Sequence, residues 1–251
     1  MSEFQGKVAV VTGGAQGMGR EYVRLLAEAG AKVMIADVNQ AVAEATIAEI
    51  GAGDNVAFFQ TDVSSTDACD ACARATVDRF GGIDFLINNA GLLSAAAHRS
   101  LVKVDLDIYH KVLGVMSHGM LYMARAVVPA MEARGGGAIV NISSIGAYQV
   151  SGLYSLSKVF VNGLTVNIAH ELAASNIRVN AIAPGTVATE GMAPLMTPEQ
   201  MSAWGKMGGR PTDRVAHPSE IARVGLFLLS DAASYVRGQI IAVDDGQQVR
   251  I

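Results

Sequence analysis

A tyrosine and a lysine one helical turn apart point to proton-transfer chemistry. Tyr154 and Lys158 lie in the stretch GLYSLSKVF, and if it is helical their side chains share one face. A free phenol has a pKa of about 10, and a nearby ammonium lowers it by stabilising the phenolate. Ser144 closes an apolar run, GAIVNISS, ten residues earlier. These residues suit acid–base catalysis on an alcohol or ketone oxygen, and the plainer alternative is a surface tyrosine beside a solvated lysine.

Three glycines near the amino terminus have the spacing of a phosphate-binding turn. Gly13, Gly17 and Gly19 lie in VVTGGAQGMGR, between an apolar run and a helical pattern. Glycine lets the backbone turn tightly and approach a phosphate, and the free N–H groups at the start of the next helix favour an anion. A P-loop would require Gly-Lys-Ser/Thr, whereas Arg20 follows Gly19 here. The pattern therefore predicts a dinucleotide site.

An acidic residue at the end of the second apolar run indicates which dinucleotide binds. Asp37 follows the glycines by about 20 residues, where a carboxylate accepts hydrogen bonds from a ribose 2′-hydroxyl. The 2′-phosphate of NADP would meet like charge there, and Gln16 in the glycine loop supplies no basic group to compensate. We therefore expect NAD as the cofactor.

Apolar runs alternate along the chain with patterns typical of amphipathic helices. Strands that are apolar throughout, each followed by a helix, indicate a parallel sheet covered on both faces. We expect an α/β fold, a Rossmann-type doubly wound parallel sheet of about seven strands, as a single domain over residues 1–251. The predicted strands are 7–12, 31–37, 55–60, 83–88, 137–143, 176–182 and 239–244. The predicted helices are 19–30, 42–51, 67–81, 107–135, 152–175 and 218–234.

The segment around residues 186–217 interrupts this alternation. It is rich in proline and methionine and contains Trp204, the one tryptophan of the chain. A long irregular insertion in a compact domain is often a lid over a binding site. The alternative is a short helix whose methionines fill gaps in the core, and both interpretations can hold at once.

Composition excludes several classes of partner. The 251-residue chain is 51% hydrophobic and has a net charge of −4, with scattered basic residues. Nucleic acids and anionic membranes require a basic patch, so we expect neither partner. The first residues lack a signal-peptide pattern, and no apolar stretch approaches the ~18 residues that span a bilayer.

The two cysteines form a single C-x-x-C pattern within a helical stretch. Cys69 and Cys72 have no second cysteine pair and no histidine pair at ligand spacing to complete a metal site. We interpret them as structural residues, expect no bound metal, and expect a reducing cytoplasm as the compartment.

Four motifs in the expected order resemble those of the short-chain dehydrogenase/reductase family, across essentially the whole chain. They are TGGAQGMG for the cofactor, NNAG (88–91) after the fourth strand, YSLSK for Tyr-x-x-x-Lys, and APGTVAT (183–189), which contacts the nicotinamide carboxamide. The resemblance implies an NAD-dependent alcohol dehydrogenase or ketone reductase with Ser144, Tyr154 and Lys158 as catalytic residues. The cofactor-binding residues that it implies, together with the glycine pattern, are Gly13, Gln16, Gly17, Met18, Gly19, Asp37, Asp62, Val63, Asn89, Ala90, Gly91, Tyr154, Lys158, Pro184, Gly185, Val187 and Thr189.

Two features depart from the family pattern. The gap before Tyr154 is short, so either Ser143 or Ser144 can be the catalytic serine, and we favour Ser144 as the last residue of its motif. Met116 takes the place of the asparagine that the family usually carries in the long helix after NNAG. A thioether is a weak acceptor and no donor, so methionine cannot replace an amide in a proton relay.

The substrate is expected to be a small molecule, mainly an apolar secondary alcohol or its ketone. Met116 alone favours an alternative, a non-catalytic or weakly active dinucleotide-binding sensor or scaffold, and a 3-oxoacyl reductase is the nearest enzymatic alternative. The long helices are apolar over more than one stripe, which together with the resemblance predicts a homotetramer. The candidate substrate contacts are Leu93, Ser94, Gln149, Leu153, Met192 and Met196.

Overall fold

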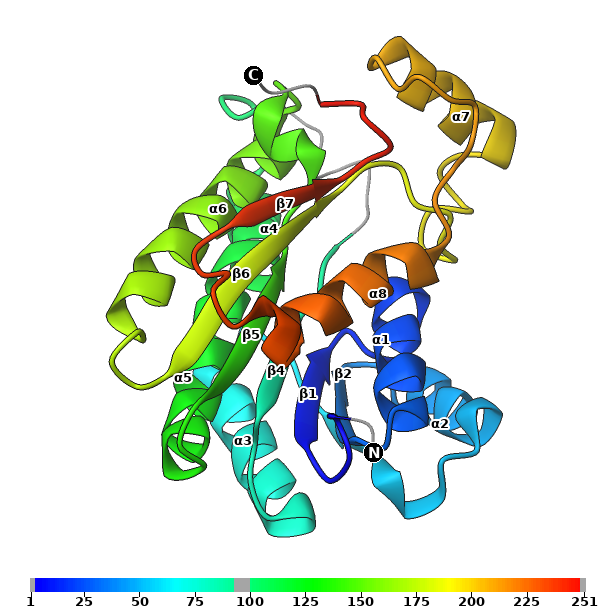
Figure 1. The fold of residues 1–251 in the computed structure, drawn as a ribbon. Helices are drawn as coiled ribbons and strands as arrows, with labels where there is room; N and C mark the ends of the chain where they lie inside the picture. The colour runs from blue at the N-terminus through cyan, green and yellow to red at the C-terminus, as the bar shows by residue number, and fades with distance from the viewer. Residues whose placement is uncertain (1–2, 93–99, 249–251) are drawn as a thin grey trace.

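A seven-stranded parallel sheet forms the centre of the protein (Figure 1). The computed structural model describes residues 3–92 and 100–248. The strand order β3-β2-β1-β4-β5-β6-β7 is that of a doubly wound Rossmann-type sheet, as predicted. The strands are β1 (Val8–Thr12), β2 (Lys32–Asp37), β3 (Val56–Gln60), β4 (Phe85–Asn88), β5 (Gly137–Ile142), β6 (Ile177–Pro184) and β7 (Ile240–Val243).

Helices cover both faces of the sheet, which explains why most residues of its strands are apolar. Ala9 and Val11 of β1 belong to the hydrophobic cluster on one face, and Val8 and Val10 belong to the cluster on the other. The first face carries α1 (Gly17–Glu28), α2 (Gln40–Ile50) and α8 (Pro218–Leu229). The second carries α3 (Thr66–Phe80), α5 (Gly119–Ala133) and α6 (Gly152–Glu171), with α4 (Leu106–Leu113) beside α6.

Helices α1 and α8 come from opposite ends of the chain and lie side by side (Figure 1). Gly225 of α8 permits this approach, because a Cβ atom there would lie 2.3 Å from the ring of the fully buried Tyr22. The start of α1 is thereby supported from both sides of its axis, by the sheet and by α8. This support matters because the glycine loop leads directly into α1.

Local sequence signals mark the ends of α3. The hydroxyl of Ser65 accepts a hydrogen bond from the N–H of Ala68, and the helix stops at Gly81, whose φ of 88° favours glycine. Cys69 and Cys72 lie inside this helix as free, fully buried thiols whose pKa values burial raises. Both pack in the cluster on the second face, in keeping with a structural role.

The helix expected over 107–135 is not one regular α-helix, so that prediction was wrong in detail. A π-helical turn, Gly114–His118, separates α4 from α5, and the N–H of Gly119 bonds to the carbonyl of Gly114. The turn inserts one extra residue into the helix and rotates Met116 and Ser117 into the interior, where both are buried. Such turns are frequent at functional sites.

Residues 186–217, named the lid segment after the prediction from sequence, combine irregular turns with a short helix. Helix α7 (Pro198–Met207) begins with a capping box in which the Thr197 hydroxyl and the Gln200 side chain bond each other's backbone N–H groups. Met201 is buried, whereas Met207 is 82% exposed, so the methionines do not simply fill the core. The turns before α7 and the helix itself project beyond the body of the sheet (Figure 1). Within the described residues, no helix has the length and apolar character needed to cross a bilayer.

Candidate active site

A cavity of about 410 Å³ opens where the loops that follow β1 to β5 meet α6 and the start of the lid segment. In a parallel sheet this is the edge at which all carboxyl ends converge. Most of the predicted cofactor residues line it. They are Gly13, Gln16, Gly17, Met18, Asp37, Asp62, Val63, Asn89, Ala90, Gly91, Tyr154, Lys158 and Thr189.

Hydrogen bonds hold the glycine loop against the loop after β4. The Thr12 hydroxyl accepts from the N–H groups of Asn89 and Ala90 at 2.9 and 3.0 Å. The Asn89 amide donates to the carbonyls of Thr12 and Gly13 at 3.1 and 3.0 Å. Gly19 lies behind this loop, where a Cβ atom would be 1.9 Å from the Gly13 carbonyl oxygen. These hydrogen bonds and this close packing hold the glycine loop in place in the protein alone.

Asp37 presents its carboxylate at the end of β2. One oxygen accepts from the N–H of Ala15 at 3.1 Å and the other from the N–H of Asn39 at 3.0 Å. These bonds fix the carboxylate between the glycine loop and the start of α2. The nearest charged residue of the lining in sequence is another acid, Asp62. A ribose hydroxyl can donate a hydrogen bond to a carboxylate, whereas a phosphate close to it would meet like charge.

Lys158 is a buried ammonium at the carboxyl end of β5. It is only 5% exposed, and its Nζ atom donates to the carbonyl of Ile142 at 2.9 Å. Burial lowers its pKa from 10.5 to about 8. The group therefore stays protonated at pH 7 and becomes neutral at mildly alkaline pH.

Tyr154 lies one turn before Lys158 on α6, with the ammonium 5.9 Å from the centre of its ring. The expected lowering of its pKa does not occur in the protein alone. Burial raises the pKa of Tyr154, and a hydrogen bond with Ser144 opposes that effect only in part. A low-dielectric site disfavours the phenolate unless further positive charge reaches it.

The two neighbouring serines differ in their partners. Ser143 donates to the Asn162 side chain at 2.6 Å, which points its hydroxyl into the protein. Ser144 accepts from the N–H of Gly146 at 3.0 Å and contacts Tyr154. Ser144 is thus the serine whose hydroxyl lies beside the phenol, although Ser143 is the one that lines the cavity.

Several predicted residues do not line the cavity. Gly185 lies instead at a separate cavity of about 60 Å³ beside Thr186 and Arg210. Leu153 is fully buried in a cluster with Val112 and Met116. Leu93 and Ser94 lie outside the described residues. The remaining predicted residues outside the lining are Gly19, Ser144, Gln149, Pro184, Val187, Met192 and Met196.

The lining also contains residues that sequence reasoning did not select as sites. Val38 and Asn39 follow Asp37 directly, so their position at the end of β2 was a usable signal. Met116, which departs from the family pattern and whose bulk is expected to narrow the site, also lines the cavity. It packs with Val112 and Leu153, so an apolar wall stands near Tyr154. The other added residues are Ala36, Thr61, Val115, Ile142 and Gly191. Ser143, the alternative catalytic serine, and Leu92, a predicted substrate wall, also line the cavity.

The residues present fit a nicotinamide dinucleotide. The Thr189 hydroxyl is buried in the lining without a hydrogen-bond partner, which a carboxamide can supply. At the far end, Asp37 can accept from a ribose hydroxyl, and the glycine loop between them leaves room for phosphates. Among the described residues, no three histidine, cysteine or acidic side chains converge to hold a metal ion.

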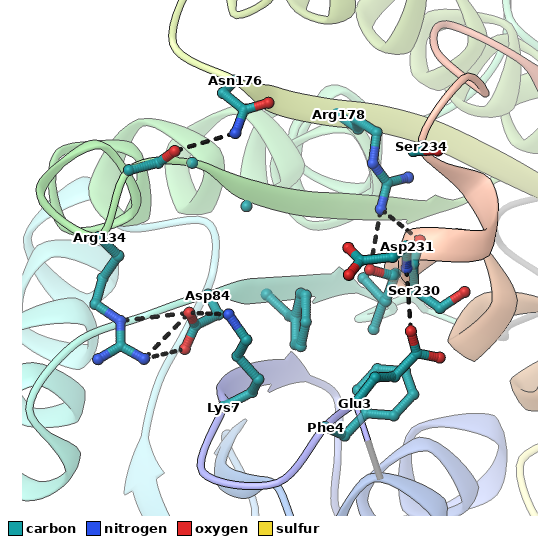
Figure 2. A pocket seen from close by; sticks show the side chains of 15 residues that line it. Glu3, Phe4, Lys7, Asp84, Arg134, Asn176, Arg178, Ser230, Asp231 and Ser234 are labelled. Atoms are coloured by element: carbon teal, nitrogen blue, oxygen red, sulfur yellow. Dashed lines mark hydrogen bonds and ion pairs between the residues drawn. The ribbon is translucent and has the colours of Figure 1, made fainter. Parts of the chain in front are cut away.

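A second cavity, of about 260 Å³, lies at the opposite end of the sheet (Figure 2). Its charged side chains bind one another or the backbone. Asp84 pairs with Lys7 at 3.2 Å and with Arg134 at 2.8 Å, and Arg178 donates to three carbonyls at the end of α8. These groups join strands to helices, so we assign this cavity a structural role.

Known proteins share both the sequence and the fold. Residues 13–248 match the family model described as enoyl-(acyl carrier protein) reductase. The chain is 44% identical to an uncharacterized oxidoreductase of Mycobacterium tuberculosis over 98% of this chain and 99% of that protein. It is 40% identical to cis-4-hydroxycyclohexanecarboxylate dehydrogenase of Sinomonas cyclohexanicum over 97% of each. The crystal structure of levodione reductase matches with a TM-score of 0.89 at 32% identity, covering 98% of each chain.

The chain therefore belongs to the short-chain dehydrogenase/reductase family. It is an oxidoreductase of the class that acts on alcohols and ketones, and members of this family use NAD or NADP.

The buried ammonium gives a pH-dependent stability. Because its folded pKa of about 8 lies below the ordinary 10.5, the unfolded state binds more protons between these values. Stability should therefore rise with pH across this window. The test measures the free energy of unfolding of the wild type and of Lys158→Met by urea denaturation at several pH values. The wild-type value minus the variant value should rise by about 2–3 kcal/mol between pH 7.5 and 10.5. The matched control is Lys103→Met, at an exposed lysine, for which the same difference in unfolding free energy should not change with pH. If the difference for Lys158→Met also stays constant with pH, Lys158 is not a buried charge.

Proposed function

We propose that this protein is an NAD-dependent dehydrogenase or reductase that interconverts a mainly apolar secondary alcohol and its ketone. The observation that carries the proposal is the placement of Tyr154 and Lys158 in the cavity whose other end is Asp37. A single ligand that spans the cavity would have its ribose hydroxyl beside the Asp37 carboxylate at one end. At its other end it would meet Tyr154 and Lys158, the proposed acid–base pair. A non-catalytic sensor would have no use for a buried ammonium beside a phenol.

The side chains suggest how the reaction proceeds. The Ser144 hydroxyl, which contacts Tyr154, would hold the substrate oxygen. The Tyr154 phenolate oxygen would take the alcohol proton, or its hydroxyl would return that proton to a ketone. Lys158 stabilises the phenolate with its positive charge. Bound at the glycine loop and Asp37, NAD would supply the hydride acceptor for the alcohol carbon and the further positive charge that the buried phenol needs.

Asp37 supports NAD over NADP. Its two oxygens are already oriented by the N–H groups of Ala15 and Asn39, so a 2′-phosphate would meet a fixed negative charge. The described lining has one basic side chain, Lys158, and this lies at the catalytic end. The same argument disfavours an NADPH-dependent 3-oxoacyl reductase, although the chain is 36% identical to the enzyme of that name from Thermotoga maritima.

The apolar wall supports an uncharged substrate. Met116 and Leu92 line the cavity, and Met116 packs in the buried cluster with Val112 and Leu153. No described cation besides Lys158 faces this space to bind an acidic substrate. One relative is named for cis-4-hydroxycyclohexanecarboxylate, whose ring carries a secondary hydroxyl. The carboxylate of that compound would meet no described cation here besides Lys158, so only its ring and hydroxyl support the proposal. We therefore favour a cyclic secondary alcohol whose ring contacts Met116.

A homotetramer is supported by an apolar face on α6. Leu156, Val159, Phe160 and Val166 are between 39% and 50% exposed on this helix. Apolar side chains gathered on one helix face commonly mark a protein interface.

We also propose the cytoplasm as the compartment, because Cys69 and Cys72 are free thiols.

Replacing Tyr154 by phenylalanine tests the proposed chemistry. Tyr154→Phe removes only the hydroxyl, so kcat should fall by about 10²–10⁴, while the Kd of NAD should change by less than about 2-fold. Tyr122→Phe, on α5 behind the sheet, is the control and should retain wild-type activity. The assignment fails if Tyr154→Phe keeps most of the activity of the wild type with a good substrate.

Placing a charge on the α6 face tests the assembly. The wild type should have four times the 26.1 kDa chain mass in light scattering at micromolar concentration. Val159→Asp should shift it toward smaller species, because the charge would be buried in the interface. Val102→Asp makes the same change at a 94% exposed position outside this face and should leave the mass unchanged. A monomeric wild type would contradict the tetramer.

A further inference from the structure

A carboxylate of the lid segment binds the start of α1. Glu190 lies directly after Thr189, and its Oε2 atom accepts a hydrogen bond from the backbone N–H of Gly17 at 3.0 Å. Its Oε1 atom forms an ion pair with Arg20 in the first turn of the same helix. Gly17 and Glu190 are 173 residues apart, so this contact joins the glycine loop to the lid segment.

The N–H of Gly17 lies in the part of the cavity that suits a phosphate. Gly17 is the first residue of α1 and lines the cavity. Unpaired N–H groups and the helix dipole at such a position attract an anion. In this structure the anion is the Glu190 side chain. A phosphate placed beside it would meet like charge and would lack the Gly17 donor.

The lid segment also packs closely on this glycine. A Cβ atom at Gly17 would lie 3.4 Å from the Cβ of Thr189 and 3.8 Å from the Glu190 carboxylate. The lid segment therefore contacts Gly17 through van der Waals packing as well as through the hydrogen bond. Glu190 is itself 47% exposed, so its carboxylate can rotate into solvent without crossing the core.

We infer that Glu190 is a latch that holds the lid segment on the glycine loop and must release Gly17 before a phosphate-containing ligand binds. The inference rests on the proposed dinucleotide site and adds a residue that sets how tightly the phosphates are held. Arg20 keeps a second partner, Glu49 at 3.5 Å, and so stays in place when Glu190 departs. Because Thr189 precedes Glu190, release of the latch also repositions the unpaired Thr189 hydroxyl.

Binding of adenosine diphosphate and adenosine separates the latch from the rest of the site. Calorimetry should show that Glu190→Gln and Glu190→Ala bind the diphosphate about 5–10-fold more tightly than the wild type, as expected for loss of one partly exposed charge-assisted contact. Adenosine carries no phosphate, so its Kd should stay within about 2-fold. Glu49→Gln removes the same charge beside Arg20 without touching Gly17, and should match the wild type for both ligands.

Amide hydrogen exchange provides a readout that needs no ligand. In the free protein, residues 189–196 should exchange faster in Glu190→Ala than in the wild type or in Glu49→Gln, because the lid segment loses its anchor. Equal exchange in all three proteins would overturn the latch.

The calorimetric outcomes distinguish the two proposals. If the wild type binds adenosine diphosphate and Glu190→Gln binds it equally well or more weakly, the latch is overturned. The proposed dinucleotide site then still stands. Failure of every variant to bind the diphosphate overturns both. If Glu49→Gln tightens binding of the diphosphate as much as Glu190→Gln does, the latch is also overturned. Loss of one negative charge near Arg20 would then explain the effect without any contact to Gly17.

Discussion

The buried ammonium of Lys158 is the constraint on which the candidate site depends. An amine taken out of water costs free energy, and here the Ile142 carbonyl at 2.9 Å provides its hydrogen bond. That bond attaches α6 to the carboxyl end of β5 at one point. Tyr154, a single turn away on the same helix, is positioned by the same contact. The protein thus keeps a locally unfavourable charge where the proposed chemistry uses it.

The loops around this charge are held in place largely by side chains that bond to the backbone. Thr12 and Asn89 join the loops after β1 and β4, and Asp37 bonds to backbone on either side of the end of β2. None of these contacts needs a ligand. A preformed site loses less entropy when it binds, so the ligand's binding free energy is not spent on ordering the loops. The lid segment differs, because one of its contacts with the loops is the ionic one made by Glu190.

The sheet was predictable from sequence, because strands buried on both faces are mostly apolar and Gly, Asn or Asp residues mark many of the joins between strands and helices. The spacing of Tyr154 and Lys158 likewise needed only the geometry of a helix. The apolar period of the long helix carried no local signal for the π-helical turn, which ends beside Gly119, where a Cβ atom would lie 2.8 Å from the side chain of the distant Val63. Neither the pairing of Glu190 with Gly17 nor the raised pKa of Tyr154 can be read from local sequence, because distant parts of the chain create both.

Met116 shows how one substitution changes the interpretation of a site. In the sequence it departs from the family pattern, since a thioether cannot take the place of an amide, and its bulk is expected to narrow the site toward apolar substrates. In the structure it is 1% exposed, lines the cavity, and completes an apolar wall with Val112 and Leu153. Under the proposed function, the residue would form part of the substrate surface.

The central claim is that one cavity binds NAD at Asp37 and oxidises an apolar alcohol at Tyr154. The most direct test is kcat/KM for a panel of secondary alcohols, from cyclohexanols to polyols, with NAD and with NADP, following the reduced cofactor by absorbance. The account predicts turnover of cyclic apolar alcohols with NAD favoured by at least about 10-fold, the effect of one unfavourable charge contact. Preference for NADP, or activity confined to polyols, would contradict it.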